Sequence, residues 1–194
     1  MYKCLVISLI VFLIFANSDS YKPLFLPNLP FGEYRINYLG LVRCVSIPNK
    51  IAFNLYLSKK TANTTEIKGN ITNYIPFDDS FNFEFNMAIK DSIGGWKDNA
   101  LLYKRPKACS SLKMFLGNVW APIMESAGIL NATCPIPVGF YKVSGIDTAN
   151  FASSNVPKTF FYGVYKFRFF FTKKQEVYGC FILIIELKRS WETD

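Results

Sequence analysis

The chain of 194 residues contains no histidine. This absence excludes Ser-His-Asp and Cys-His nucleophile systems, histidine general bases and histidine-ligated zinc. The phosphate-binding patterns GxxxxGK[ST] and GxGxxG are also missing. A glycosidase that uses two carboxylates stays open, although none of the candidate acids has a distinctive context. We therefore expect a protein that is not an enzyme and has no metal or cofactor; the acids considered are Asp78, Asp79, Glu84 and Asp91.

Long apolar runs are scarce, and the one that stands out lies at the N-terminus. Residues 5–15 (LVISLIVFLIF) follow Lys3 and precede the small residues ANSDS. The run is too short to cross a bilayer as a helix, so it predicts a cleaved signal peptide over residues 1–20. The remaining residues 21–194 then form a single domain. We expect it to be secreted and extracellular, with the lysosomal lumen as the alternative.

Cysteines are few and none is in a CxxC pair, which leaves zinc-ribbon and thioredoxin-like proteins without support. Cys4 is removed with the signal peptide, and four cysteines remain. An even number in an oxidising compartment indicates disulfides. Three pairings are open from the sequence: they would join Cys44, Cys109, Cys134 and Cys180.

Acidic residues are outnumbered by basic ones, 14 to 22, which gives a net charge of +8. Small basic groups of this kind most often lie at solvated loop ends and keep a protein soluble. The alternative is transient contact with an anionic membrane, to which each cation near the surface adds about 1 kcal/mol. Nucleic acid is not an expected partner because the groups form no continuous stripe. They are Lys59–Lys60, Lys104–Lys107, Lys173–Lys174 and Lys188–Arg189.

Alternating apolar residues are the main pattern of the chain, and FNFEFNMAIK (81–90) shows it best: every odd position is apolar. Alternation of this kind predicts a strand with one buried face. Gly94 and Gly95 predict a hairpin between this segment and the next. Several short strands with frequent turns predict an all-β antiparallel sandwich. The expected strands are 36–47, 51–58, 71–75, 81–90, 100–104, 139–146, 163–171 and 180–187, with a polar turn region over 59–70.

One segment, residues 110–128, has helical periodicity. Ser110 or Ser111 is a suitable N-cap, Gly128 a suitable stop, and Pro122 should kink or end the helix near Ala121. The simpler interpretation is a helix that closes one side of the core. The alternative makes the helix a movable lid over an apolar opening, formed by Phe115, Trp120 and Met124.

Three further features concern the surface. Three prolines in residues 21–35 predict an extended arm, because proline forbids a helix and discourages a central strand. Trp96, beside the predicted hairpin turn, either packs on its own hairpin or contacts a membrane. Three Asn-x-Ser/Thr sequons predict N-glycosylation of a secreted protein, at Asn63, Asn70 and Asn131.

The C-terminal half resembles a known family. Its motifs are TCPIPVGFYKV (133–143), YGVYKFRF (162–169) and YGCFILIIELK (178–188), which combine a Cys-Pro step, two Gly-x-Tyr steps and a Gly-Cys step. This order is similar to that of the ganglioside activator proteins of the ML lipid-recognition superfamily. Residues 87–112 are similar to insect secreted proteins of the chemosensory CheB type. The resemblance covers roughly residues 80–188; the vertebrate activators carry more cysteines than this chain.

The resemblance implies a non-enzymatic, immunoglobulin-like β-sandwich of the ML or β-cup type, with one short helix after Cys109. It implies disulfides Cys44–Cys180 and Cys109–Cys134. It also implies that the two sheets splay apart and admit a hydrophobic ligand such as a fatty acid, glycolipid, phospholipid or pheromone, in a chemosensory or lipid-presenting role. The alternative is a secreted interaction or adhesion domain with a filled core. The candidate cavity residues are Phe53, Leu55, Phe81, Phe83, Phe85, Met87, Phe115, Trp120, Met124, Phe167 and Phe169.

Overall fold

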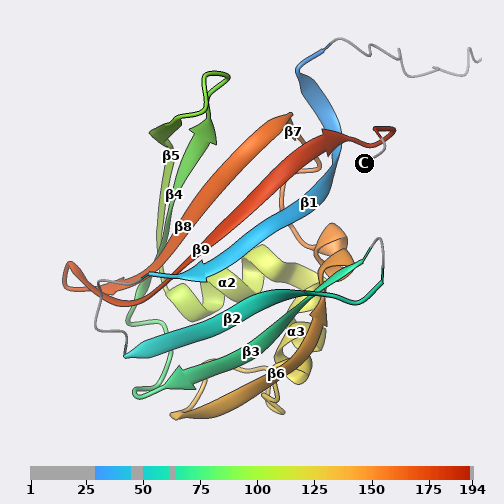
Figure 1. The fold of residues 1–194 in the computed structure, drawn as a ribbon. Helices are drawn as coiled ribbons and strands as arrows, with labels where there is room; N and C mark the ends of the chain where they lie inside the picture. The colour runs from blue at the N-terminus through green and yellow to red at the C-terminus, as the bar shows by residue number, and fades with distance from the viewer. Residues whose placement is uncertain (1–28, 45–49, 62–63, 193–194) are drawn as a thin grey trace, which may run out of the picture.

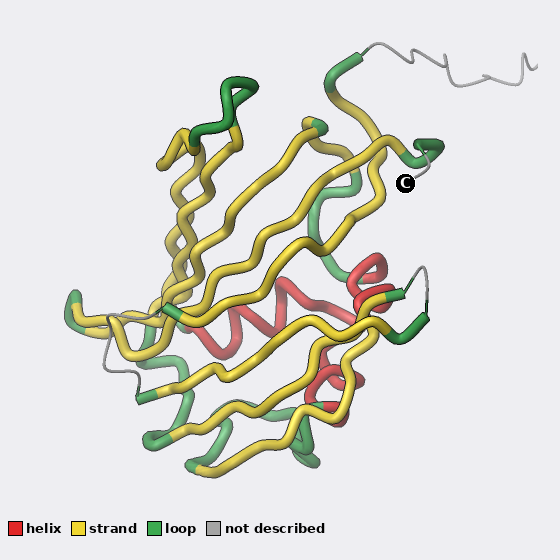
Figure 2. Tube along the Cα trace, viewed as in Figure 1, coloured by secondary structure: helices red, strands yellow, loops and turns green. Residues whose placement is uncertain are grey.

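The computed structural model describes residues 29–44, 50–61 and 64–192. These residues form two antiparallel sheets that face each other, with helices between them (Figures 1 and 2). The prediction of an all-β sandwich is confirmed. The predicted signal peptide and the sequon at Asn63 lie outside the described residues.

The large sheet has the strand order β5-β4-β8-β9-β1-β7. The predicted hairpin β4–β5 is present, and β8 and β9 form a second hairpin. The short edge strand β7 was not predicted. The bounds are β1 Phe31–Arg43, β4 Asn82–Lys90, β5 Trp96–Pro106, β7 Thr159–Phe161, β8 Gly163–Lys173 and β9 Glu176–Arg189.

The small sheet has the order β2-β3-β6, with β2 Ile51–Lys59, β3 Thr65–Asn73 and β6 Gly139–Asp147. The polar turn region expected over 59–70 is therefore too long, because β3 begins at Thr65. The polar side chains of β3 led to the wrong prediction. The strand pairs with β2 on one side and β6 on the other, so backbone hydrogen bonds stabilise it despite its polar composition.

The two sheets form a wedge. On one side they are close, since β2 lies beside β1 and β9, and the Phe53 ring is 5.6 Å from Phe171 and 5.1 Å from Phe181. On the other side the helices fill the space: α2 (Ala108–Leu116) packs on β4 and β5, and α3 (Trp120–Ser126) packs on β6. The wedge therefore has a sheet-to-sheet side and a helix-filled side.

Two disulfides tie this arrangement together, and they join the pairs that the resemblance implies. Cys44–Cys180 connects the end of β1 to β9. Cys109–Cys134 connects α2 to the loop that precedes β6. Disulfides of this kind are typical of extracellular proteins.

The single predicted helix is two α-helices joined by a 3-10 turn, η1 (Gly117–Val119). The break falls at Gly117, where φ is 58°, and not at Pro122, which fits within the first turn of α3. The predicted N-cap is also wrong, because α2 begins at Ala108 with Lys107 as N-cap. The stop at Gly128, with φ 74°, is consistent with the prediction.

The proline-rich arm is shorter than expected, because β1 begins at Phe31, directly after Pro30. The residues that follow Pro30 each have a backbone N–H that can donate to a neighbouring strand, and β1 pairs with β7 and β9. A second 3-10 helix, η2 (Thr148–Ser153), lies in the segment 148–158 that leads to β7. Its Phe151 ring lies 6.4 Å from Tyr38 of β1.

Candidate functional site

The inner face of the large sheet, which faces the small sheet, carries aromatic side chains in register on three neighbouring strands. Odd positions of β4 and β8 point to this face, as the alternation of the sequence predicts. The strand pairing places them side by side: Phe83 with Phe171, Phe85 with Phe169, Met87 with Phe167, Phe167 with Leu183, and Phe169 with Phe181.

These rings form one connected set of aromatic contacts. The Phe85 and Tyr103 rings stack with centroids 4.8 Å apart, and so do Phe169 and Phe181. Phe115 of α2 reaches the set from the helix-filled side, with its ring 6.0 Å from Phe83. Aromatic contacts of this geometry add about 0.5–1.5 kcal/mol each to the burial of the rings.

The burial of the inner side chains varies along β4, β8 and β9: it is high at both ends and lower in the middle. At one end the inner side chains join a large buried cluster that includes Phe83 and Phe171. At the other end they join a second, smaller buried cluster that includes Met87 and Tyr165. The inner residues between the two clusters are only partly buried. We call them the aromatic band: Phe85, Phe167, Phe169, Phe181 and Leu183 from the large sheet, with Tyr103 of β5 and Phe115 of α2.

The candidate cavity residues therefore divide into two groups. A side chain next to a void large enough for water keeps accessible surface, so fully buried residues are packed against protein. Those packed in the core are Phe81, Phe83, Met87, Trp120 and Met124. Those that are partly buried are Phe53, Leu55, Phe85, Phe115, Phe167 and Phe169.

Three members of the band were missed from the sequence: Tyr103, Phe181 and Leu183. The signal that finds them is the same alternation, applied to the return strand and the last strand. Phe181 and Leu183 pair with Phe169 and Phe167.

The structure gives little support to the alternative in which the helix is a movable lid, because α3 is held in place. Trp120 is 2% exposed, and its Nε1 donates to the backbone oxygen of Ala132 at 2.7 Å. Phe115 is the helix residue that keeps accessible surface beside the band. It belongs to α2, and the Cys109–Cys134 disulfide holds the same helix.

Tyrosines surround the smaller buried cluster. Burial is the main cause that raises the pKa of Tyr38, and burial also raises the pKa of Tyr34 and Tyr165. Their hydroxyls donate to backbone oxygens, for example Tyr165 to Phe161 at 2.8 Å. The region beyond the band is therefore apolar, with its phenol groups neutral and hydrogen-bonded.

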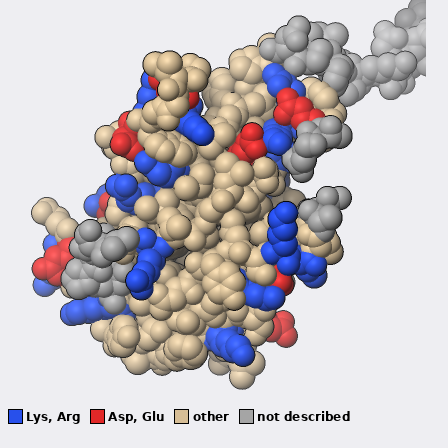
Figure 3. Space-filling model, in the orientation of Figure 1, with Lys and Arg blue, Asp and Glu red and all other residues tan. Residues whose placement is uncertain are grey.

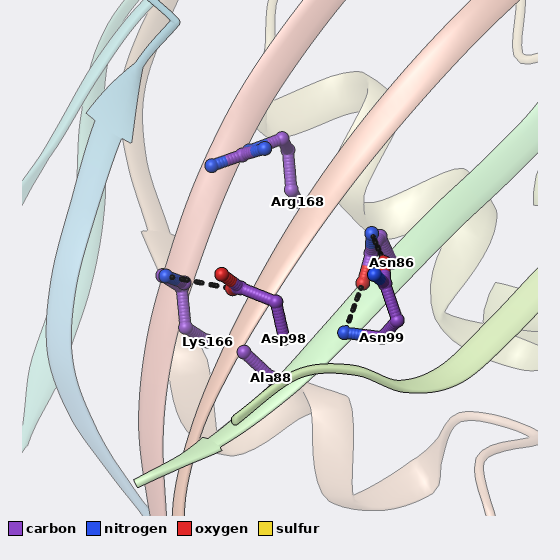
Figure 4. A pocket seen from close by; sticks show the side chains of 6 residues that line it. All are labelled: Asn86, Ala88, Asp98, Asn99, Lys166 and Arg168. Carbon is purple, nitrogen blue, oxygen red and sulfur yellow. Dashed lines mark hydrogen bonds and ion pairs between the residues drawn. The ribbon is translucent and has the colours of Figure 1, made fainter. Parts of the chain in front are cut away.

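Two pockets of the large sheet lie on its other, outer face and not between the sheets. One, of about 180 Å³, is polar and is shown in Figure 4. The other, of about 450 Å³, is more open and is lined by Glu84, Lys104, Phe170, Thr172, Gln175 and Val177. Neither pocket is the apolar cavity that the resemblance implies.

Each carboxylate considered for hydrolysis accepts a hydrogen bond or pairs with a lysine. Asp78 accepts from the backbone N–H of Ser80 at 2.8 Å, and Asp79 accepts from Ser110. Glu84 is 2.8 Å from Lys104 Nζ, and Asp91 is 3.0 Å from Lys97 Nζ. Among the described residues no group of histidine, cysteine, aspartate and glutamate is arranged to hold a metal ion.

The basic residues lie in separate places on the face that Figure 3 shows. Several of those in the predicted basic groups are paired: Lys60 is 3.0 Å from Asp147, and Arg189 is 2.7 Å from Glu192. Trp96 is 36% exposed, with Lys166 Nζ 4.7 Å from its ring centroid. The tip of the β4–β5 hairpin carries Ile93, which is 93% exposed.

No protein-family model matches the chain, and no curated protein is similar to it. The resemblance to the ganglioside activator proteins therefore stays a prediction from the motifs. Within the part of the chain that the structure covers, no helix has both the length and the apolar character needed to cross a membrane.

Proposed function

We propose that the protein is a secreted, non-enzymatic lipid-binding protein of the ML type that holds an acyl chain or another elongated hydrophobic ligand along the aromatic band. The observation that carries the proposal is the partial burial of the band between two fully buried clusters. A core that only stabilises the fold has no need to leave its central aromatic residues accessible.

The band offers enough apolar contact for useful affinity. Each CH₂ group transferred from water to an apolar site contributes about 0.8 kcal/mol, so a chain of about 16 carbons gains roughly 12 kcal/mol before ordering costs. The ring stacking of Phe85 on Tyr103 presents a preformed surface. Affinity therefore requires no polar chemistry at the band.

Secretion is part of the proposal and has two supports. Residues 1–20 have the pattern of a signal peptide, and the two disulfides suit an oxidising compartment. In such a compartment the sequons at Asn70 and Asn131 are proposed glycosylation sites, as is Asn63. Asn131 is exposed, in the loop after α3.

A second candidate function is an interaction or adhesion domain with a filled core. The observation that favours it is the complete burial of five of the candidate cavity residues, Phe83 and Trp120 among them. The two candidates differ in one measurable property, since only a lipid carrier leaves its host cell with lipid bound.

The test is native mass spectrometry of the full chain secreted from a eukaryotic host, combined with lipid extraction and uptake of a fluorescent fatty acid. We expect bound lipid and saturable uptake. Phe85→Glu should abolish uptake, because it places a charge in the band. The matched control is Val42→Glu, on β1 and already 48% exposed.

A homogeneous apo mass, with no extractable lipid and no uptake, would contradict lipid binding and favour the interaction domain. Thermal unfolding of both variants shows whether they fold. Phe85→Trp is the second variant, because it keeps the band apolar but narrows it, and should weaken uptake without loss of the fold.

A further inference from the structure

The small polar pocket on the outer face of the large sheet lies on the opposite side from the aromatic band. Asn86 and Ala88 alternate along β4 with the inward Phe85 and Met87, so they point outward. The pocket has a volume of about 180 Å³ and combines residues of three strands: Asn86 and Ala88 of β4, Asp98 and Asn99 of β5, and Lys166 and Arg168 of β8 (Figure 4).

A bulge in β5 builds the pocket. Met87 pairs with Leu101 and Ile89 pairs with Lys97, so residues 98–100 of β5 all lie opposite Ala88. The extra residues fold over β4, and Ala88 is 1% exposed beneath them. The small side chain of Ala88 leaves room above it, where a larger one would fill the space.

The side chain of Asn86 fixes the bulge. Its Nδ2 donates to Asn99 Oδ1 at 2.5 Å, and its Oδ1 accepts from the backbone N–H of Asn99 at 3.3 Å. Asn99 itself has φ 61°, a left-handed conformation that asparagine tolerates better than most residues. Asn99 Nδ2 has no hydrogen-bond acceptor in the described part of the chain, so it keeps its two N–H groups for a ligand.

The charges of the pocket do not balance. Lys166 Nζ is 3.3 Å from Asp98 Oδ1, and this lysine side chain is 19% exposed. Arg168 forms no hydrogen bond or ion pair with any residue that the structure describes. Two cations and one carboxylate leave one net positive charge, and the guanidinium that supplies it presents a planar set of donors suited to an oxyanion.

We propose that this pocket binds the oxyanion, carboxylate or phosphate, of a hydroxylated ligand about the size of one monosaccharide. Arg168 contacts the oxyanion, Asn99 Nδ2 donates to it or to a neighbouring oxygen, and Asp98 accepts from a hydroxyl. The pocket is smaller than the ~300–1,000 Å³ of sites for drug-sized ligands, which limits the ligand to this size. The proposal does not depend on lipid binding at the inner face.

The test is NMR titration of the ¹⁵N-labelled full chain with three probes of one size: glucuronate, glucose 6-phosphate and glucose. We expect saturable shifts of the amide signals of Asp98, Asn99 and Lys166 with the two anions and not with glucose. The tighter of the two anions identifies whether carboxylate or phosphate is preferred. Equal shifts with glucose, or no shifts at these amides with any probe, would overturn the proposal.

Two variants test the named contacts. Arg168→Gln should weaken binding of the better anion about tenfold or more, as expected for loss of a charge-assisted hydrogen bond. Asn99→Gly removes the amide while glycine keeps the left-handed backbone, and should weaken binding several-fold. The matched control is Arg105→Gln, which removes the same charge from β5 outside the pocket. Binding by Arg168→Gln that equals wild type, or an equal loss in Arg105→Gln, would contradict the assignment.

Uptake of the fluorescent fatty acid by Arg168→Gln separates this site from the proposed lipid function. We expect it to be unchanged, because the side chain lies on the other face of the sheet. Loss of uptake together with anion binding would indicate that the variant disturbs the whole sheet, and would overturn a local role for Arg168.

Discussion

At the scale of single residues, Asp79 shows how a side chain distant in the sequence can satisfy a backbone N–H in the first turn of a helix. Its carboxylate accepts from the backbone N–H of Ser110 at 2.8 Å and from the Ser110 hydroxyl at 2.6 Å, although 31 residues separate the two. The pKa of Asp79 lies below its ordinary value, chiefly because of the hydrogen bond from the Ser110 hydroxyl. No local pattern in residues 107–111 could predict this cap, because the acceptor comes from another segment.

Asp79→Ala should lower the free energy of unfolding by about 1 kcal/mol at neutral pH, the usual cost of a lost helix cap. A lowered pKa in the folded state means that the carboxylate stabilises the fold above its ordinary pKa of 3.8, and that this stabilisation is lost as the pH falls through the lower folded value. Urea unfolding of wild type and variant should therefore differ at pH 7 and converge below the folded pKa of Asp79.

The control for this change is Glu33→Ala, an exposed acid at the start of β1. It should leave stability unchanged at both pH values. A gap between wild type and Asp79→Ala that stays the same in acid would show that the carboxylate charge is not what caps α2.

At the scale of elements, the sequence pattern predicted the strands that have one apolar and one polar face. It did not predict most of β3, which was expected to be part of a polar turn region. The strands β4 and β8 alternate apolar and polar residues, so their faces could be assigned from composition. In β3, Ile67 and Ile71 face inward, but Gly69 stands between them and the intervening residues are polar. Pairing with β2 and β6 holds this strand, and pairing partners are not visible in a local sequence pattern.

Gly69→Ala should destabilise the protein by about 2 kcal/mol or more, since it combines a steric conflict with an unfavourable backbone conformation. The φ of Gly69 is +130°, and a Cβ there would lie 2.0 Å from the backbone oxygen of Asn54 on β2. Thermal or denaturant unfolding measures the loss.

Gly95→Ala is the comparison for this change, because a Cβ at Gly95 meets nothing within 4 Å. It should alter stability by less than about 0.5 kcal/mol. Equal stability of the two variants would mean that β3 does not approach β2 as closely at Gly69 as the structure has it.

At the scale of the whole molecule, the sandwich class followed from strand count and turn spacing, and the disulfide pairs followed from the resemblance. The division of the inner aromatic residues between the buried core and the aromatic band could not be predicted from either. Phe83 and Phe85 are equivalent in the sequence pattern, yet one is 1% exposed and the other is partly buried. The difference depends on how far the helices and the small sheet extend over the large sheet, which is a property of the assembled fold.

From the composition of the β4–β5 hairpin tip we predict that the molecule contacts an anionic membrane through this hairpin. Ile93 and Trp96 lie at its tip beside Lys90, and beside Lys97, whose Nζ is 3.0 Å from Asp91. Exposed apolar and aromatic side chains next to a basic residue suit an anionic interface. Ile93→Asp should reduce binding to phosphatidylserine-containing vesicles in a sedimentation assay. Wild-type binding should fall as salt rises.

Leu130→Asp is the matched control, because Leu130 is 94% exposed and follows α3, far from the hairpin in the chain. It should bind vesicles as wild type does. Binding that salt does not change, or that both variants lose equally, would exclude docking through the hairpin.

The anchoring of α2 has a consequence for how a guest molecule could exchange with solvent. The helix is fixed by the Cys109 disulfide and by Asp79, and Asn155 donates from Nδ2 to its Met114 backbone oxygen at 2.7 Å. The segment 148–158 that supplies Asn155 is itself held in several ways: Tyr34 donates to the Pro157 oxygen, the Thr148 hydroxyl donates to the Thr65 oxygen at 2.7 Å, and Phe151 packs against the core. A ligand that passed this side of the molecule would have to separate these contacts while the disulfide keeps α2 in place, so its exchange with solvent should be slow.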